Sequence, residues 1–203
     1  MKIICIGRNY AAHAKELNNP VPGEPVIFLK PDTALLAKKM PFFYPDFSKD
    51  VHYEAELVVR IDKVGKNIPQ QFAHKYYSQL SVGIDFTARD LQQEYKKNGL
   101  PWERAKAFDG SAPVGKFIDK EQFSNLNELN FSLKINGEER QRGNTANMLF
   151  SIDAIIAYVS TFFTLKIGDL LFTGTPEGVG PVNIGDKMEA YIENQKVFDL
   201  KIK

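Results

Sequence analysis

Apolar and polar residues alternate along Val51-His52-Tyr53-Glu54-Ala55-Glu56-Leu57-Val58-Val59. A period of two residues is typical of a half-buried β-strand. The pattern predicts a strand over 51–59 with one face in the core and a second face that carries His52, Glu54 and Glu56. An acidic face on a strand in the middle of the chain is therefore the first candidate for chemistry.

Two segments nearer the C-terminus predict β-hairpins. Alternation over 131–135 leads into Asn136-Gly137, the strongest short hairpin signal, and continues over 138–141. Apolar residues alternate again on both sides of Glu193-Asn194-Gln195. We expect a second hairpin to end the chain.

Helical spacing of apolar residues is clearest over 152–163, after a Ser151 cap. Three shorter helices are predicted over 10–17, 69–79 and 88–98. For the last of these, Thr87 and Asp90 have the spacing of a capping box. Strands outnumber helices and do not alternate with them regularly, so the fold class predicted is α+β.

The composition excludes several classes of protein. The 203 residues include 26 Lys and Arg against 25 Asp and Glu, which argues against a dedicated nucleic-acid binder. The single cysteine, Cys5, excludes an intrachain disulfide, and its apolar neighbours indicate buried packing. No apolar run approaches the 18 residues of a membrane span. We expect one domain over 1–203 in a soluble cytoplasmic protein without a nucleic-acid or membrane partner.

Three acids could bind a metal. Glu54 and Glu56 project from the same face of the predicted strand, with roughly 7 Å between their Cβ atoms. Asp85 lies near the end of a second apolar strand, 81–87, just before a helix. The spacing alone favours a solvated sheet face for the two glutamates and a helix-capping role for the aspartate.

Two other groups could act on a substrate. His13 and Glu16 are three residues apart on a predicted helix, where a carboxylate can orient an imidazole as a general base; an exposed helical pair is the alternative. Lys106 lies among small and aromatic residues. It could hold an anion, form a Schiff base if burial lowered its pKa, or extend along the surface. The glycine-rich segment 173–181 has no Walker motif, and could cradle a carboxylate or form a tight turn.

Six segments in order carry a resemblance that covers nearly the whole chain. They are Gly7-Arg8-Asn9-Tyr10 with His13, Phe28-Leu29-Lys30-Pro31, His52-Tyr53-Glu54-Ala55-Glu56-Leu57, Asp85-Phe86-Thr87-Ala88-Arg89-Asp90, 102–106 and Phe172-Thr173-Gly174-Thr175-Pro176. In this order they resemble the fumarylacetoacetate hydrolase family, specifically its short single-domain branch of acylpyruvate hydrolases and oxaloacetate decarboxylases. The resemblance implies a mixed β-sheet roll with short flanking helices, usually a homodimer, without the N-terminal domain of larger members.

The resemblance also implies roles for the candidate residues. The metal ligands for Mg²⁺ or Mn²⁺ are Glu54, Glu56 and Asp85. The catalytic residues are His13 and Glu16, a water-activating dyad on a lid helix, and Lys106, which faces the substrate. The residues that line the substrate pocket are Arg89, Gln92 and Thr175. Larger members have a further acidic ligand where this chain has Ile6, so a three-carboxylate site is expected.

The implied chemistry is that of small 2-oxo acids. A divalent metal bound by the C1 carboxylate and C2 carbonyl oxygens stabilises an enolate at C2–C3. Cleavage of the C3–C4 bond then releases pyruvate from an acylpyruvate by hydrolysis, or CO₂ from oxaloacetate. Keto–enol tautomerisation of 2-oxo dicarboxylic acids is an alternative in the same family, and a binding protein without catalysis is the alternative from another class.

Overall fold

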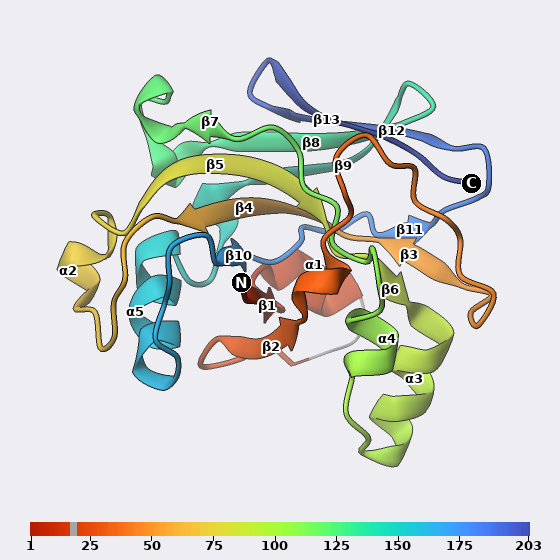
Figure 1. Ribbon diagram of the computed structural model, residues 1–203, viewed down its shortest axis with the longest axis horizontal. Coiled ribbons are helices and arrows are strands. Elements are labelled where there is room, and N and C mark those ends of the chain that lie inside the picture. Colours follow the sequence, from red (N-terminus) through yellow and green to blue (C-terminus); the bar gives the residue numbers. More distant parts are fainter. Residues whose placement is uncertain (17–19) are drawn as a thin grey trace.

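The computed structural model describes residues 1–16 and 20–203, and three sheets form its framework (Figure 1). The largest sheet has six strands in the order β2 (Val26–Lys30), β1 (Ile3–Gly7), β10 (Leu170–Phe172), β4 (Ala55–Ile61), β5 (Tyr77–Ile84) and β7 (Ile118–Asp119). β1 and β10 run parallel, whereas the other neighbours are antiparallel. This mixed sheet confirms the α+β class and the expected β-sheet roll.

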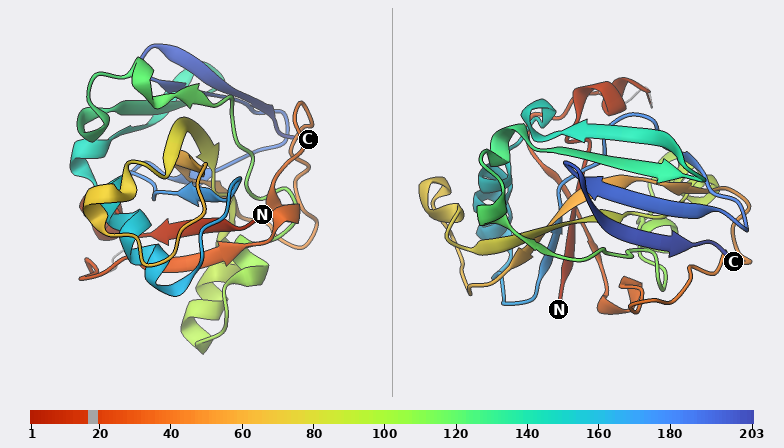
Figure 2. Two further views of the ribbon diagram at one scale, coloured as in Figure 1. Left: turned by 60° about the vertical axis from the view of Figure 1, so that its left-hand side comes forward. Right: turned by 90° about the horizontal axis from the view of Figure 1, so that it is seen from above.

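The second sheet consists of the two predicted hairpins, which are both confirmed. Its strands follow the order β13 (Gln195–Lys201), β12 (Lys187–Ile192), β8 (Asn130–Ile135) and β9 (Glu138–Asn144). Asn136 and Gly137 have φ angles of 53° and 86°, the positive values that a two-residue hairpin loop needs. This sheet lies across one face of the larger sheet, in contact with β4 and β5 (Figure 2).

The third sheet corrects the prediction of one continuous strand over 51–59. The chain is interrupted at Glu54, so that β3 (Val51–Tyr53) pairs with β6 (Thr87–Ala88) and β11 (Gly180–Pro181), while β4 pairs with β5. The antiparallel partner is interrupted at the same level, between β5 and β6, and the Asp85 amide donates to the Glu54 carbonyl at 2.8 Å. Both acids therefore lie where a pair of strands passes from one sheet into another.

Both faces of the six-stranded sheet are buried. One apolar cluster joins its β4–β5 face to the hairpin sheet and to the helix over 152–162, and a smaller cluster on the other face includes Cys5, Val58 and Phe172. Cys5 is fully buried, as expected. The polar face predicted for 51–59 is therefore not a solvated face, because a sheet covered on both sides leaves no strand face to water.

The helices agree with the sequence in part. They are α1 (Ala11–Glu16), α2 (Gln70–Ala73), α3 (Arg89–Asn98), α4 (Glu103–Lys106) and α5 (Ile152–Phe162), with 3₁₀ turns at Asp32–Ala34, Lys120–Gln122, Leu126–Glu128 and Thr145–Asn147. The predicted Ser151 cap is confirmed, since its Oγ accepts from the Ala154 amide. α1 begins after Tyr10, which forms a bridge with Met148, and Leu17 of the predicted helix lies outside the described residues.

The helix predicted over 88–98 is confirmed as α3, whereas one other helix prediction and one capping prediction were wrong. The helix over 69–79 ends after a single turn because Tyr77 already pairs with Ile61 in the sheet. The capping box at Thr87 and Asp90 is absent: Ala88 precedes α3, and the Asp90 carboxylate instead accepts from Ser48 Oγ at 2.7 Å. Within the described residues, no helix has the length and apolar composition needed to cross a bilayer.

Candidate active site

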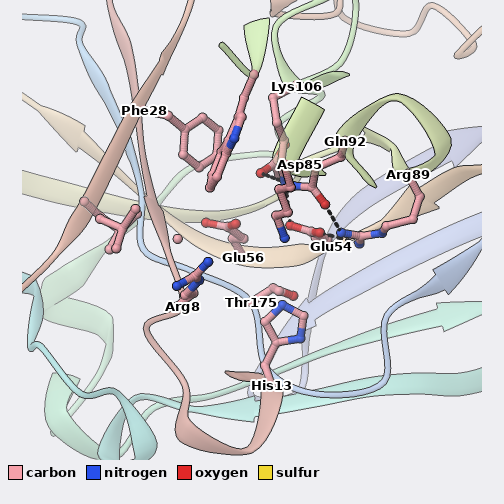
Figure 3. A pocket seen from close by; sticks show the side chains of 15 residues that line it. Arg8, His13, Phe28, Glu54, Glu56, Asp85, Arg89, Gln92, Lys106 and Thr175 are labelled. Atoms are coloured by element: carbon pink, nitrogen blue, oxygen red, sulfur yellow. Dashed lines mark hydrogen bonds and ion pairs between the residues drawn. The ribbon is translucent and has the colours of Figure 1, made fainter. Parts of the chain in front are cut away.

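The acids and the loops around them meet at one edge of the six-stranded sheet. Glu54 precedes β4, Asp85 follows β5, the segment from Thr173 follows β10, and Arg8 follows β1. β1 and β10 are parallel, whereas β4 is antiparallel to both β10 and β5, so these positions fall on the same side of the sheet. A pocket opens there, and Figure 3 shows the side chains that line it.

The three candidate metal ligands lie together. One carboxylate oxygen from each of Glu54, Glu56 and Asp85 falls within 4.8 Å of the others, and all three residues are buried, with at most 5% exposed. Burial excludes the solvated-face alternative for the two glutamates. Asp85 does not cap α3 either, because the chain passes through β6 before the helix begins.

Three buried cations surround these acids. Lys30 Nζ lies 2.7 Å from Asp85 Oδ1, and Arg89 donates to Glu54 Oε1 at 2.6 Å. Lys106 Nζ donates to Glu54 Oε2 at 2.8 Å and to Asp85 Oδ2 at 2.7 Å. Burial raises the pKa of Glu54, but the charges of Lys106 and Arg89 outweigh burial and hold it well below its usual range. Glu54 is therefore a carboxylate at neutral pH.

Lys106 is not a surface lysine, and its contacts with two carboxylates favour the protonated amine over a Schiff-base nucleophile. Its side chain is buried, and its ammonium also donates to Thr87 Oγ1 at 2.6 Å. Burial lowers the pKa of Lys106, but the charges of Asp85 and Glu54 raise it by a larger amount, so the net shift is upward. A protonated amine cannot attack a carbonyl, whereas it can donate hydrogen bonds to a developing negative charge.

Glu56 differs from its neighbours because a backbone amide is its hydrogen-bond donor. The Gly174 amide donates to Glu56 Oε2 at 2.6 Å. Gly174 has φ of 98°, and a Cβ there would approach Asn9 Cβ to 2.6 Å, so the position requires glycine. The glycine-rich segment therefore cradles a carboxylate of the protein itself. Burial and the charges of Asp85 and Glu54 raise the pKa of Glu56 well above its usual value.

The chemistry of this cluster fits a hard divalent cation. Three buried carboxylates that repel one another supply the oxygen ligands that Mg²⁺ and Mn²⁺ prefer. Within residues 1–16 and 20–203, no group donates a hydrogen bond to Asp85 Oδ1, although Lys30 lies at ion-pair distance. This buried oxygen retains lone pairs for a metal, so the three acids could hold one.

The His13–Glu16 pair lies across the pocket from the acids. His13 Nδ1 and Glu16 Oε2 are 3.0 Å apart, and Glu16 Oε1 accepts from the Gly178 amide at 3.0 Å. A carboxylate can only accept, so Nδ1 is the donor of this contact, and in a neutral imidazole the other ring nitrogen, Nε2, is the acceptor. His13 is 5% exposed and its ring points into the pocket, which excludes a fully exposed helical pair (Figure 3).

The predicted substrate-pocket residues also line this cavity. Arg89 donates to Gln92 Oε1 at 2.6 Å, so the two side chains from α3 form one unit. Thr175 Oγ1 donates to the Ala55 carbonyl and accepts from Gln141 Nε2, both at 2.9 Å. The Thr175 hydroxyl is thus already held by the fold.

Sequence reasoning missed part of the lining. No role was predicted for Arg8, Phe28, Lys96 or Trp102, which line the pocket, or for Lys30, which is buried beneath it. A signal was present for Lys30, since a lysine that follows the apolar run of a strand is unusual. Lys96 could have been found from its spacing of seven residues from Arg89 along a helix, which places both on one face.

The other two histidines are separate from the pocket lining. His52 Nε2 lies 2.9 Å from Asp50 Oδ1, and His74 follows α2. Burial and the charge of Arg89 lower the pKa of His52.

The pocket brings a buried cluster of three carboxylates that could hold a metal together with a histidine–glutamate pair, and comparisons with known proteins identify the family. The sequence profile of the fumarylacetoacetate (FAA) hydrolase C-terminal domain matches residues 2–202. The chain therefore belongs to the fumarylacetoacetate hydrolase family, as the resemblance implied.

Individual relatives are similar over almost their whole length. The chain is 46% identical to mitochondrial oxaloacetate tautomerase FAHD1 of Mus musculus. The match extends over 201 residues, which are 99% of this chain and 91% of the relative. It is 45% identical to oxaloacetate tautomerase YcgM of Escherichia coli, over 92% of this chain and 86% of the relative. The crystal structure of fumarylpyruvate hydrolase from Pseudomonas aeruginosa in complex with Mn²⁺ and pyruvate superimposes with a TM-score of 0.93 at 39% identity, covering 100% of this chain and 89% of that one. Family relatives thus include enzymes that act on 2-oxo acids.

Proposed function

We propose that this protein is a divalent-metal-dependent enzyme that interconverts the keto and enol forms of a small 2-oxo dicarboxylic acid such as oxaloacetate. The observation that carries the proposal is the buried cluster of Glu54, Glu56 and Asp85, which faces the His13–Glu16 pair across one pocket. Two relatives with 45–46% identity are named oxaloacetate tautomerases, which favours tautomerisation over the cleavage reactions.

In this proposal Glu54, Glu56 and Asp85 would hold Mg²⁺ or Mn²⁺, and the ion would supply a Lewis acid for the 2-oxo group, which makes the protons on C3 more acidic. The Mn²⁺ and pyruvate in the fumarylpyruvate hydrolase complex support a divalent ion, without choosing between the two metals.

The side chains of this protein would move the proton. His13 Nε2 would take a proton from C3, and the imidazolium, stabilised by the contact of Glu16 with Nδ1, would give it to the 2-oxo oxygen to complete the enol; the reverse transfers return the keto form. Lys106, protonated and aimed at the carboxylates, adds a positive charge beside the 2-oxo oxygen, where negative charge develops. Arg89 keeps Glu54 ionised and holds Gln92 at the pocket wall.

Cleavage of the C3–C4 bond is the second candidate, and the same histidine favours it. A base that can take a proton from C3 can also take one from water, which would attack the C4 carbonyl of an acylpyruvate. A fumarylpyruvate hydrolase with 39% identity supports this alternative.

A panel of substrates separates the two reactions. The purified protein is stripped with a chelator, supplied with Mg²⁺ or Mn²⁺, and assayed with enol-oxaloacetate, acetylpyruvate and fumarylpyruvate. Loss of enol absorbance and appearance of pyruvate are followed separately. A tautomerase removes the enol without forming pyruvate; pyruvate from an acylpyruvate at a comparable kcat/KM would favour the hydrolase, and full activity in chelator would contradict the metal requirement.

A further inference from the structure

Gln141 is a buried polar side chain of the hairpin sheet that contacts the six-stranded sheet beside the acid cluster. It lies on β9, is 2% exposed, and pairs across the hairpin with Leu133. The next pair of this ladder joins Lys134 to Glu139, so Arg140 is an extra residue that forms a β-bulge. A bulge increases the local twist of a strand and can change the direction of a neighbouring side chain. The irregularity in β9 therefore lies directly beside Gln141.

Ala55, the residue between Glu54 and Glu56, has side chains as hydrogen-bond partners for its backbone groups. The Glu54 carbonyl faces β5, where it accepts from a backbone amide, so the amide and carbonyl of Ala55 face the other side of β4. There the Ala55 amide donates to Gln141 Oε1 at 2.8 Å, and the Ala55 carbonyl accepts from Thr175 Oγ1 at 2.9 Å. Two side chains from distant segments thus hold the peptide that separates two candidate metal ligands.

Backbone groups fix the direction of each of these hydrogen bonds. The Ala55 amide can only donate, so the oxygen of the Gln141 amide must face it. The nitrogen of Gln141 then donates to Thr175 Oγ1 at 2.9 Å and to the Pro176 carbonyl at 3.0 Å. The Ala55 carbonyl can only accept, so the hydroxyl proton of Thr175 points toward it. All three contacts of Gln141 therefore require an amide of this length.

The glycine-rich segment that Gln141 contacts also holds groups on two sides of the pocket. The Gly174 amide donates to one of the candidate metal ligands, and the Gly178 amide donates to Glu16 of the dyad. Pro176, whose carbonyl accepts from Gln141, lies midway between these two glycines. The segment packs closely on β9, because a Cβ at Gly178 would approach a carbonyl oxygen of that strand to 2.5 Å. Gln141 thus holds the middle of this segment.

We propose that Gln141 is a positioning residue of the metal site, which fixes the separation of Glu54 and Glu56 from the neighbouring sheet. The inference rests on the proposed function, because it takes these acids as ligands of a divalent ion. Gln141 acts through Ala55 and Thr175 rather than by contact with the ion. Mg²⁺ demands near-ideal octahedral geometry, so movement of the peptide between two of its ligands should weaken its binding.

The alternative is that Gln141 only satisfies buried backbone groups, as buried polar side chains generally do. Thr145 is a matched case for this role. It follows β9, is 7% exposed, and its Oγ1 accepts from the Leu129 amide at 2.9 Å and donates to the Leu126 carbonyl at 2.8 Å. Among the described residues, those that line the pocket do not include Thr145. Thr145→Val therefore removes the same kind of contact outside the site.

Calorimetric titration of the chelator-stripped protein with Mg²⁺ alone tests the proposal without turnover. We expect the Kd to rise about tenfold in Gln141→Met, whose side chain has a similar length but cannot donate. Gln141→Asn keeps the amide on a side chain one methylene shorter, and it should also raise the Kd. Thr145→Val should lower the urea midpoint of unfolding and leave the Kd at the wild-type value.

The contacts at Ala55 also predict how substitutions of Gln141 and Thr175 combine. Thr175→Val removes the donor to the Ala55 carbonyl, whereas Thr175→Ser keeps the hydroxyl and should keep the wild-type Kd. Because both side chains hold one peptide, Gln141→Met should raise the Kd by a smaller factor in Thr175→Val than in the wild-type protein. Equal factors in the two backgrounds would contradict a shared action on this peptide.

A wild-type Kd in both Gln141 variants, or an equal rise in Thr145→Val, would overturn the proposal. If Gln141→Met does not fold, Gln141→Asn decides the question. If Mg²⁺ binding depends on Gln141 but the wild-type protein turns over no 2-oxo acid, the proposed function fails and the positioning role stands. If the wild-type protein is a metal-dependent enzyme and the Gln141 variants bind Mg²⁺ normally, the reverse holds.

Discussion

The acid cluster at the sheet edge and the hairpin sheet both contain lysine–aspartate ion pairs of the same length, one buried and the other exposed to water. Lys106 Nζ lies 2.7 Å from Asp85, and Lys196 Nζ on β13 lies 2.7 Å from Asp199. The first pair has side chains 4% and 1% exposed, whereas those of the second are 40% and 68% exposed. Water screens the second pair, and the first has lost its water.

This difference in burial indicates different roles for the two sets of ion pairs. A buried ion pair seldom repays its desolvation, so the cluster at the sheet edge is weak evidence for stability and good evidence for function. The exposed pairs on β9 and β13 each contribute little to stability. Four changes test this contrast, beginning with the largest expected effect.

Glu54→Gln should abolish both metal binding and turnover. The neutral amide removes one ligand charge and leaves Arg89 and Lys106 without the carboxylate that both now contact. We expect Mg²⁺ affinity, measured by calorimetry, and kcat/KM to fall by more than about 100-fold. Glu189→Gln on β12 removes an acid that pairs with Lys196 on the surface and should change neither quantity.

His13→Ala tests the pair of intermediate burial. His13 and Glu16 have side chains 7% and 33% exposed. Loss of the base should lower kcat by about 10²- to 10⁴-fold while Mg²⁺ binding stays at the wild-type level. Undiminished turnover of both oxaloacetate and acylpyruvates would remove the dyad from the mechanism.

Lys30→Met tests how much a buried ion pair contributes to the free energy of unfolding. Lys30 is 2% exposed, and its ammonium contacts Asp85 as well as the carbonyl and hydroxyl oxygens of Ser111. Removing one partner of a buried pair leaves the other uncompensated, so the free energy of unfolding should fall by about 3 kcal/mol. Urea titration measures it, and a variant as stable as wild type would show that Lys106 alone neutralises Asp85.

Lys196→Met is the surface counterpart and the smallest expected effect. Lys196 pairs with Glu189 and Asp199 at the surface, so the same substitution should cost less than about 1 kcal/mol. High salt should reduce even this loss, because exposed charges are screened. If the two lysine variants lose equal stability, burial does not distinguish the two regions.

The parts of the fold that local pattern could predict are the hairpins and α5. Asn136-Gly137 takes positive φ angles that few residue pairs tolerate, and Ser151 caps α5 through its own side chain. The failures occurred where tertiary partners overrode local preference. Tyr77 pairs with Ile61 in the sheet instead of extending a helix, and Asp90 is held by Ser48 instead of capping α3.

For the site, alternation placed Glu54 and Glu56 on one face of a strand, but spacing alone favoured water on that face. The family resemblance, and not the spacing, assigned them to a metal. No local pattern indicated that Lys30, from β2, lies against Asp85. Such a contact joins segments 55 residues apart, and only the packing of the sheets brings them together.

By itself, the sequence determined the α+β class, both hairpins, α5 and the family, because short-range periodicity, turn chemistry and ordered motifs are properties of neighbouring residues. Tertiary structure alone decided that the two strand pairs break at Glu54 and Asp85, that both faces of the larger sheet are covered, and that Arg8 and Lys96 face one pocket. The physical reason is burial. The charge state and the contacts of these side chains depend on which distant segments exclude water from them.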